Sequence, residues 1–565
     1  MKVTTTKSKN SESFYITKSY VNNEGKSTSK TIRKLGTLKE LSQQLGTDRD
    51  GVMAWAKEQA RIETEKYKKQ NQAKTVLIPF HADRTLDYHQ QKLFKGGYLF
   101  PQAVYYQLGL DRICRKIRDK HSFHYDINAV LSDLIYTRIL EPSSKLASYQ
   151  VAKEFLEPPS YEEHDVYRAL DVLASECDLI QAEVYKNSNF VTQRMDRILY
   201  YDCTNYYFEI EQAEGSKQYG KSKEHRPNPI IQMGLFTDGQ GIPLAFSLFP
   251  GNQNEQKSLK PLEQKVLTDF GHEKFIYCCD AGLGSEANRE LNHMGKRAFI
   301  VTQSIKKLPK EDREWALSPK GFKRVMDEEP VDINTIKETD RVHLYYKDEP
   351  YTTKRLDQRL IITYSPKYAA YQKEIRRRQI ERAEKMVASG RRKAERKNPN
   401  DPARFVGKLH YFLDEGKIAE EERYDGLYAV CTDLLDDDVK DILKVSEGRW
   451  KIEECFRIMK TEFEARPTFV RLENRITAHF LICFLALLVY RLLELKLEGA
   501  YTCEEILSTL KGMNFADIEG QGYMPLYKRE RITDALHEVC GFRTDYQFIT
   551  KQKMKEIQKK SKGRE

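Results

Sequence analysis

One segment, residues 198–303, constrains the fold of this 565-residue chain more than any other. It opens with ILYYDCTNYYFEI, which is rich in β-branched and aromatic residues and therefore typical of a strand. Residues 229–250 add two strands across an Asp-Gly-Gln-Gly turn. Four further stretches alternate between helix-like and strand-like patterns: SLKPLEQKVLTDF, KFIYCCD, SEANRELNHMG and RAFIVTQSI. Three strands followed by two helix–strand pairs predict a mixed sheet flanked by helices.

The predicted order of elements is that of a ribonuclease H-like α/β fold. The alternation stops after Lys307 and resumes with the strand-like GLYAVCTDL at residues 426–434, so we expect a strand-containing insertion inside the core. The flanking regions are predicted to be an N-terminal hairpin plus helix, a helical domain before the core, and a helical C-terminal region with a basic tail. In chain order the predicted boundaries are 1–80, 92–197, 198–303, 304–423, 424–497 and 498–565.

Hydropathy and cysteine usage disfavour several classes of protein. The longest apolar run, Phe480–Tyr490, is only eleven residues long, whereas a membrane span needs about 20, so we interpret it as a buried helix. Ten cysteines with no CxxC pair disfavour a structural zinc site and a disulfide framework, and they fit a reducing cytoplasm. No GxxxxGK[ST] motif is present, so we expect no nucleotide cofactor.

The charge distribution favours nucleic acid weakly. The formal net charge is +10, which solubility would explain equally well. Lys373–Lys397 contains eleven basic and four acidic residues, and Lys551–Glu565 contains seven basic and two acidic ones. Such runs neutralise phosphates in nucleic-acid-binding proteins, but they are also typical of solvated faces and tails.

Two aspartates lie on predicted core strands. Asp202 is central in ILYYDCTNYYFEI, where a charged carboxylate is costly unless it is paired or binds a metal. Asp280 ends KFIYCCD, and carboxylates at the carboxyl ends of strands in α/β sheets often face the ligand crevice. Each has a structural alternative, which is a hydrogen-bonded or edge-strand role for Asp202 and a turn cap for Asp280.

A third carboxylate lies on a predicted helix at about residues 448–464. At about 100° per residue, Arg449 lies roughly 40° from Glu453 and Lys460 roughly 20°, so one stripe carries a carboxylate between two cations. The alternative is an ordinary charge stripe on a surface helix. Glu454 is a rival ligand, but it lies about 100° from Glu453, on the side away from the cations.

Three carboxylates suit a particular metal chemistry. Mg²⁺, or Mn²⁺ in its place, prefers hard oxygen ligands and needs only a few carboxylates, because it keeps several waters. Two such ions can activate a water or a 3′-hydroxyl and stabilise the leaving oxygen of a phosphodiester. The pattern therefore predicts a two-metal site that acts on nucleic acid.

The helix stripe resembles a family signature. One superfamily of bacterial insertion-sequence transposases of the DDE type carries Tyr-x2-Arg-x3-Glu-x6-Lys, and this chain carries Ser446-x2-Arg449-x3-Glu453-x6-Lys460, with serine in place of tyrosine. The likeness extends over roughly residues 92–497. It includes the blocks RILEPSSK, YYDCTNYYFE, SKEHRPNPIIQMGLFTDGQGIPLAFSLFPGN, CDAGLGS and RWKIEECFRIMKTEFEARPTFV.

This resemblance implies a ribonuclease H-like core in which Asp202, Asp280 and Glu453 form an acidic triad. It further implies that Arg449 and Lys460 contact phosphates near the scissile bond. The implied reaction is metal-dependent cleavage at terminal inverted repeats, followed by joining of the freed 3′-hydroxyl to target DNA; relatives often excise through a DNA hairpin. Three further candidates for DNA contacts each have a structural alternative: a turn salt bridge for His225 and Arg226, and packing for Trp315.

The implied partner is double-stranded DNA, in the form of terminal repeats and target, bound by a homodimer in the bacterial cytoplasm and nucleoid. The N-terminal module is a candidate for end binding from its position alone. Two alternatives stay open at this point. The chain could be a metal-dependent endonuclease that does not join strands, or a DNA-binding derivative of a transposase without catalysis.

Overall fold

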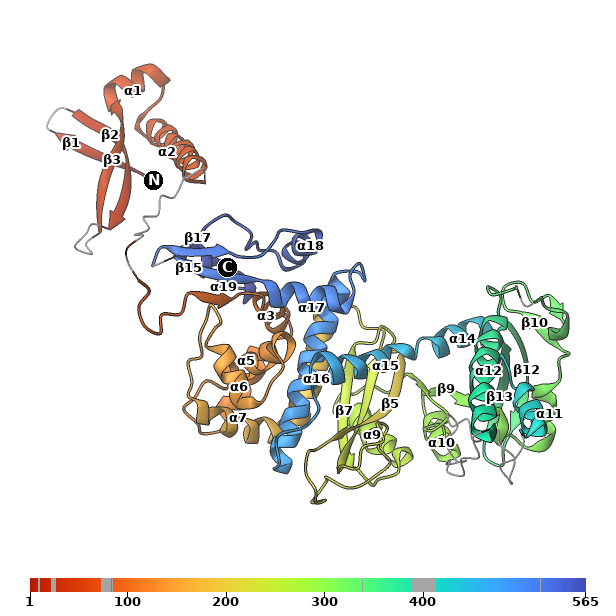
Figure 1. Ribbon diagram of the computed structural model, residues 1–565. Coiled ribbons are helices and arrows are strands. Elements are labelled where there is room, and N and C mark those ends of the chain that lie inside the picture. The colour runs from red at the N-terminus through yellow and green to blue at the C-terminus, as the bar shows by residue number, and fades with distance from the viewer. Residues whose placement is uncertain are drawn as a thin grey trace. The chain divides into compact units, whose positions relative to one another are not determined.

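The computed structural model describes residues 1–8, 11–21, 27–72, 83, 85–337, 339–388, 413–518 and 520–564. The chain divides into two compact units, Met1–Tyr88 and His89–Glu565 (Figure 1). The smaller unit contains a three-stranded antiparallel sheet and two helices, and the larger one contains every candidate site residue.

The N-terminal unit contains more structure than the predicted hairpin and helix. An extra strand, β1 (Lys2–Ser8), pairs with β2 (Ser11–Val21), which pairs with β3 (Ser27–Thr37). A short helix, α1 (Leu38–Leu45), begins directly after β3 because Thr37 and Glu40 form a capping box. The predicted helix is α2 (Arg49–Gln72). A small core of Phe14, Leu41, Val52 and Ala56 joins the helices to the sheet.

The larger unit is organised around one mixed sheet, as the sequence predicts. The first core strand, β5 (Ile198–Tyr207), pairs antiparallel with β6 (Ile230–Asp238), which pairs with β7 (Pro243–Pro250). On its other side β5 pairs parallel with β8 (Ile276–Cys279), which pairs parallel with β9 (Ala298–Gln303). Two helices occupy the connections around β8, namely α9 (Leu259–Thr268) and α10 (Glu286–His293).

The predicted insertion extends this sheet. The second core strand, β14 (Leu427–Thr432), pairs with β9 on one side and with β13 on the other, so strands of residues 304–423 continue the sheet to ten strands. These elements are β10 (Phe322–Arg324), β11 (Pro330–Val331), β12 (Tyr345–Thr352), β13 (Asp357–Tyr364), α11 (Lys310–Leu317), α12 (Pro366–Ala388) and α13 (Glu415–Glu422). Only the part of the basic run Lys373–Lys397 up to Ala388 is among the described residues.

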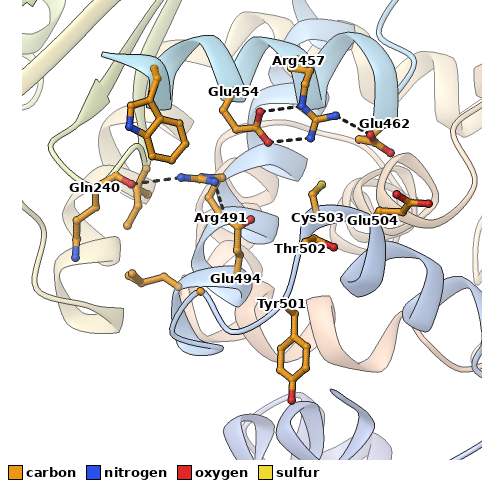
Figure 2. Close-up of a pocket in the computed structure, with 14 residues that line it drawn as sticks. Gln240, Glu454, Arg457, Glu462, Arg491, Glu494, Tyr501, Thr502, Cys503 and Glu504 are labelled. Atoms are coloured by element: carbon orange, nitrogen blue, oxygen red, sulfur yellow. Dashed lines mark hydrogen bonds and ion pairs between the residues drawn. The ribbon is translucent and has the colours of Figure 1, made fainter. Parts of the chain in front are cut away.

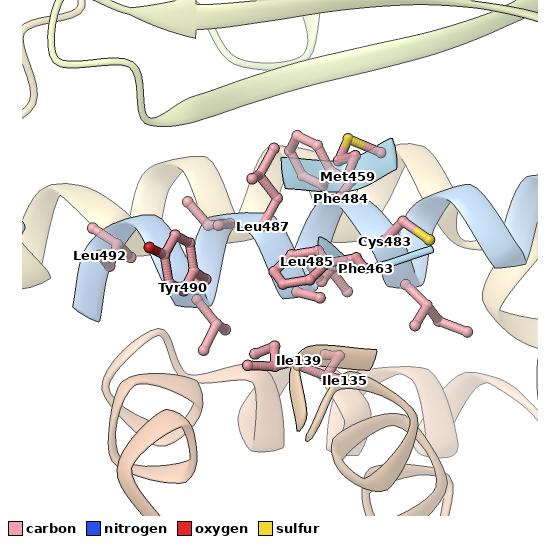
Figure 3. Packing of buried hydrophobic residues seen from close by; sticks show 14 of the residues in the cluster. Ile135, Ile139, Met459, Phe463, Cys483, Phe484, Leu485, Leu487, Tyr490 and Leu492 are labelled. Atoms are coloured by element: carbon pink, nitrogen blue, oxygen red, sulfur yellow. The ribbon is translucent and has the colours of Figure 1, made fainter. Parts of the chain in front are cut away.

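A buried helix, α16 (Glu473–Lys496), connects the sheet to the helical domain. By length and composition it could cross a membrane, but 89% of its most apolar stretch is buried inside the protein. It packs on β7 and on α5 and α7 of the helical domain, which confirms the predicted buried helix around Phe480–Tyr490. Figure 3 shows Ile135 and Ile139 of α5 facing this helix. The helices of that domain are α3 (Leu99–Gln107), α4 (Leu110–Lys120), α5 (Ile127–Leu140), α6 (Lys145–Ala152), α7 (Glu163–Ser175) and α8 (Cys177–Val191).

The C-terminal region is not purely helical. The elements are α17 (Cys503–Gly512), β15 (Asn514–Ile518), β16 (Gly522–Pro525), α18 (Arg531–Cys540), β17 (Ile549–Thr550) and α19 (Lys551–Ser561). The three short strands form a four-stranded sheet with β4 (Leu93–Lys95), in the order β17-β16-β15-β4. The pairing of β15 with β4 joins the two ends of the larger unit, which no local periodicity could indicate. The basic tail packs on the rest of the larger unit, because its helix buries Met554 and Ile557.

Candidate functional site

Strands β5 and β8 bring two of the predicted carboxylates to neighbouring positions. Their parallel register pairs Tyr201 with Cys279, so Asp202 and Asp280 follow next to one another on adjacent strands. Strand β8 ends at Cys279 while β5 continues, so both carboxylates lie at the carboxyl end of β8. Asp202 is half-buried, and 66% of the Asp280 side chain is exposed.

The turn after β8 is built tightly enough to fix Asp280. Its carbonyl accepts hydrogen bonds from the N–H groups of Leu283 and Gly284 at 3.0 and 3.1 Å. A Cβ at Gly284 would lie 1.9 Å from Cγ1 of Val301 on β9, so this position requires glycine. The turn therefore packs directly on the sheet and holds Asp280 at its edge.

Arg449 brings the C-terminal part of the core to the same edge. It lies between α14 (Val439–Glu447) and α15 (Trp450–Arg457), and its Nη1 atom is 2.5 Å from Oδ1 of Asp280. Its Nη2 atom donates to the Tyr428 hydroxyl at 2.8 Å. The preceding Gly448 permits this approach, since a Cβ there would lie 2.0 Å from the Tyr200 hydroxyl on β5.

Helix α15 then runs along β5 and is held at its far end by Lys460. Its buried residues include Ile452 and Phe456, and the helix packs on β5, while Glu453 is exposed. Nζ of Lys460 donates to Oγ1 of Thr204 at 2.5 Å, and Thr204 lies on the same face of β5 as Asp202. We call the sheet edge that carries Asp202 and Asp280 the carboxylate edge. Glu453 lies between Arg449 and Lys460, the two residues that attach this segment to that edge.

The helix departs from the ideal geometry on which the sequence prediction relied. After Arg457 it widens into a π-helical turn, Ile458–Glu462, in which the Phe463 N–H donates to the Ile458 carbonyl at 3.0 Å. Lys460 lies in this turn. Its angular position relative to Arg449 and Glu453 therefore differs from the one that a regular α-helix would give. Single π-turns of this kind are frequent at functional sites.

Burial shifts the pKa values of two side chains at the carboxylate edge. It raises the pKa of Asp202 to about 6, an effect that the nearby Lys223 ammonium and a 2.7 Å hydrogen bond from the Cys203 N–H partly offset. Burial also lowers the pKa of Lys460 to about 8, and Lys223 adds to that shift by repulsion. Nearby positive charge therefore only partly offsets the effect of burial on the pKa of Asp202.

Lys223 is a site residue that the sequence analysis missed. Its Nζ donates to the Cys203 carbonyl, next to Asp202, and lies 3.6 Å from Oε1 of Glu255. It lies in the SKEHRPNP block, two residues before His225.

The three other proposed DNA contacts each make local interactions of their own. Arg226 stacks over the Tyr207 ring at 4.3 Å, and Tyr207 is five residues along β5 from Asp202, or about 17 Å. His225 is exposed and has a φ of 56°. Trp315 on α11 is half-buried, with the Lys347 ammonium 4.7 Å from its ring centroid, an arrangement that fits its packing alternative. A DNA role for these three stays a prediction.

The donor set fits Mg²⁺ or Mn²⁺ in kind. All three groups offer carboxylate oxygens, and Arg449 occupies only one oxygen of Asp280. The rival Glu454 is instead held by Arg457, whose Nε and Nη2 both lie 2.8 Å from its oxygens. The three carboxylates are not drawn together around one point. Among the described residues the only His/Cys/acid trio with ligand atoms all within 4.8 Å is Asp534, His537 and Asp545.

A cavity of about 950 Å³ lies on another side of α15 (Figure 2). Glu454, Arg457 and Glu462 form a chain of ion pairs along its wall, and Arg491 hydrogen-bonds the Gln240 carbonyl. None of the three candidate metal ligands lines it. Because its arginines are already paired, its charges offer little to an anionic ligand, and the carboxylate edge is the stronger candidate.

Comparisons with known proteins identify the family of the chain but do not locate its site. Residues 194–489, just over half of the chain, match a family model described as "Transposase DDE domain". A solved structure of a piggyBac transposase synaptic complex with hairpin DNA is similar at 9% identity, covering 74% of this chain and 79% of the other, with a TM-score of 0.34. No curated protein matches the sequence.

Proposed function

This chain belongs to the DDE transposase family, and from that premise we propose that Asp202, Asp280 and Glu453 are its catalytic carboxylates. The observation that carries the proposal is the contact of Arg449 with Asp280, since it joins the helix of Glu453 to the edge formed by β5 and β8. These residues would hold two Mg²⁺ or Mn²⁺ ions, which supply an activated water or 3′-hydroxyl and stabilise the leaving oxygen.

The proposed core is ribonuclease H-like. Strands β5 to β9 lie in the order β7-β6-β5-β8-β9, with β5 to β7 antiparallel and with β8 and β9 parallel to β5. The order supports the proposal because it puts the first carboxylate on the central strand and the second at the end of the adjacent one. Strands from the insertion then extend the sheet beyond β9.

The protein's own side chains would act on the DNA backbone. Arg449 orients one oxygen of Asp280, and Lys460 and Lys223 bring positive charge beside Asp202, where a phosphate would approach. We propose that a dimer brings two terminal inverted repeats of an insertion sequence together, cuts them and joins the 3′-ends to target DNA. Excision through a hairpin would appear as a covalently closed product.

The test is cleavage of the gene's own flanking DNA with Mg²⁺ or Mn²⁺, with EDTA as the blank. We expect Glu453→Gln to abolish nicking at the repeat ends while DNA binding persists. Glu454→Gln is the matched control, because its carboxylate is on the same helix but is held by Arg457. Equal activity of wild type and Glu453→Gln would remove Glu453 from the site.

The products also separate the alternatives. Joined strands in the presence of target DNA would support a transposase, and nicks without any joining would support an endonuclease. Binding without cleavage by the wild type would favour a DNA-binding derivative.

A further inference from the structure

The hydroxyl of Tyr428 lies at a junction behind the carboxylate edge. It is 2.6 Å from Oγ1 of Thr302 on β9 and 2.8 Å from Nη2 of Arg449. The side chain of Ser446 on α14, which is only 6% exposed, lies near this hydroxyl. One phenol on β14 thus connects the neighbouring strand β9 with the arginine that reaches Asp280.

The direction of these hydrogen bonds follows from the groups. A guanidinium only donates, so the Tyr428 oxygen accepts from Arg449. Its single proton is then left for Thr302 or Ser446, both of which can accept it. Because Nη1 of Arg449 is held by Asp280 and Nη2 by Tyr428, the rigid guanidinium plane is fixed at both ends.

We infer that Tyr428 is the positioning residue that fixes Arg449 against Asp280. The inference rests on the proposed function, since it treats Asp280 as a metal ligand.

The consequence concerns the orientation of one carboxylate. With Arg449 fixed on Oδ1 of Asp280, the second oxygen of Asp280 is left for a metal ion. Loss of the phenol leaves Nη2 without its acceptor and lets the guanidinium turn, so Asp280 loses its orientation. Partners of this kind, one step behind the metal ligands, typically contribute about 10–100-fold in metal affinity or activity.

The experiment measures Mn²⁺ binding by the full-length protein without DNA, following free Mn²⁺ by electron paramagnetic resonance. We expect Tyr428→Phe to bind Mn²⁺ about 10-fold more weakly than wild type. The control is Tyr346→Phe. The Tyr346 hydroxyl lies on the same sheet, but in the insertion, where it donates to Glu328 at 3.3 Å. It should stay within about two-fold of wild type, because distant sites act independently. Thermal melts of Tyr428→Phe and Tyr346→Phe show whether each variant keeps its fold.

Two failures are distinguishable. Wild-type protein that binds Mn²⁺ and cleaves DNA, with Tyr428→Phe equal to it in affinity, would overturn this inference and leave the proposed function standing. Wild-type protein whose Mn²⁺ binding does not depend on Asp202 or Asp280 would overturn the proposed function, and this inference with it.

Discussion

The larger unit contains two groups of acidic side chains that differ in how their charge is balanced. At the C-terminal group, Nη2 of Arg543 is 2.5 Å from a carboxylate oxygen of Asp534 and 2.5 Å from one of Asp545, and Arg529 lies 3.0 Å from Asp534. These guanidinium groups lower the pKa of both aspartates. At the carboxylate edge, in contrast, burial raises the pKa of Asp202 to about 6.

The balanced charge makes the tighter group the weaker metal candidate. The Thr544 N–H donates to Nε2 of His537 at 3.1 Å, and Nδ1 is buried 4.0 Å from Asp545 without a hydrogen-bond partner among the described residues. Both carboxylates already have an arginine as counter-charge. We therefore expect a metal ion at the carboxylate edge rather than at this group.

The largest expected effect is on the rate of metal-dependent DNA cleavage, which should depend on Asp202 but not on Asp545. Asp202→Asn should lower the nicking rate about 10³-fold, because it removes several kcal/mol of transition-state stabilisation through the metals. Asp545→Asn should leave the rate and its Mn²⁺ dependence unchanged. Rates are measured on flanking DNA at saturating metal. A metal-dependent defect in Asp545→Asn alone would reverse the assignment.

Stability should respond in the opposite way. Asp545→Asn should reduce the free energy of unfolding by about 1–3 kcal/mol, because it removes a buried, charged hydrogen-bond partner of Arg543. Asp202→Asn in EDTA should be at least as stable as wild type, since it removes a carboxylate whose charge is poorly balanced. Urea unfolding midpoints of both variants give the comparison. A loss of stability in Asp202→Asn would mean that its charge is compensated.

The cations of the two groups should differ in DNA binding. Lys460→Ala should weaken end binding several-fold and reduce the slope of log affinity against log salt by about 0.9, as for one lost phosphate contact. Arg543→Ala should leave that slope unchanged, because its guanidinium is already used by Asp534 and Asp545. Titrations at several salt concentrations decide the point. Equal slopes for Lys460→Ala and wild type would remove Lys460 from the phosphate contacts.

The smallest expected effect is the loss of folding stability at low pH. The folded-state pKa of Asp534 and of Asp545 lies below the ordinary value of 3.8, so their ion pairs stabilise the fold above about pH 4 and are lost as the pH falls below it. Arg543→Ala should therefore lose less stability than wild type between pH 5 and about pH 3. Urea midpoints at the two pH values measure this. An equal loss in both proteins would mean that the pairs contribute nothing.

Local sequence patterns were enough to predict the elements that carry the candidate site. The β-rich run around Asp202, the strand that ends at Asp280 and the helix of Arg449 and Glu453 are all local patterns, in which residue type and spacing indicate the element. The buried helix around Phe480–Tyr490 was predictable because such an apolar run has to be shielded from water. The resemblance to DDE transposases is confirmed by the family model.

Only the tertiary structure decided which side chains meet. Arg449 reaches Asp280 across 169 residues, Lys460 reaches Thr204 across 256, and Tyr428 meets Thr302 across 126. Such contacts depend on strand register and on the π-turn after Arg457, and a shift of one residue in a strand would turn each side chain to the other face. The same reason explains why the joining of the insertion strands to the core sheet and the pairing of β4 with β15 had no signal in the sequence.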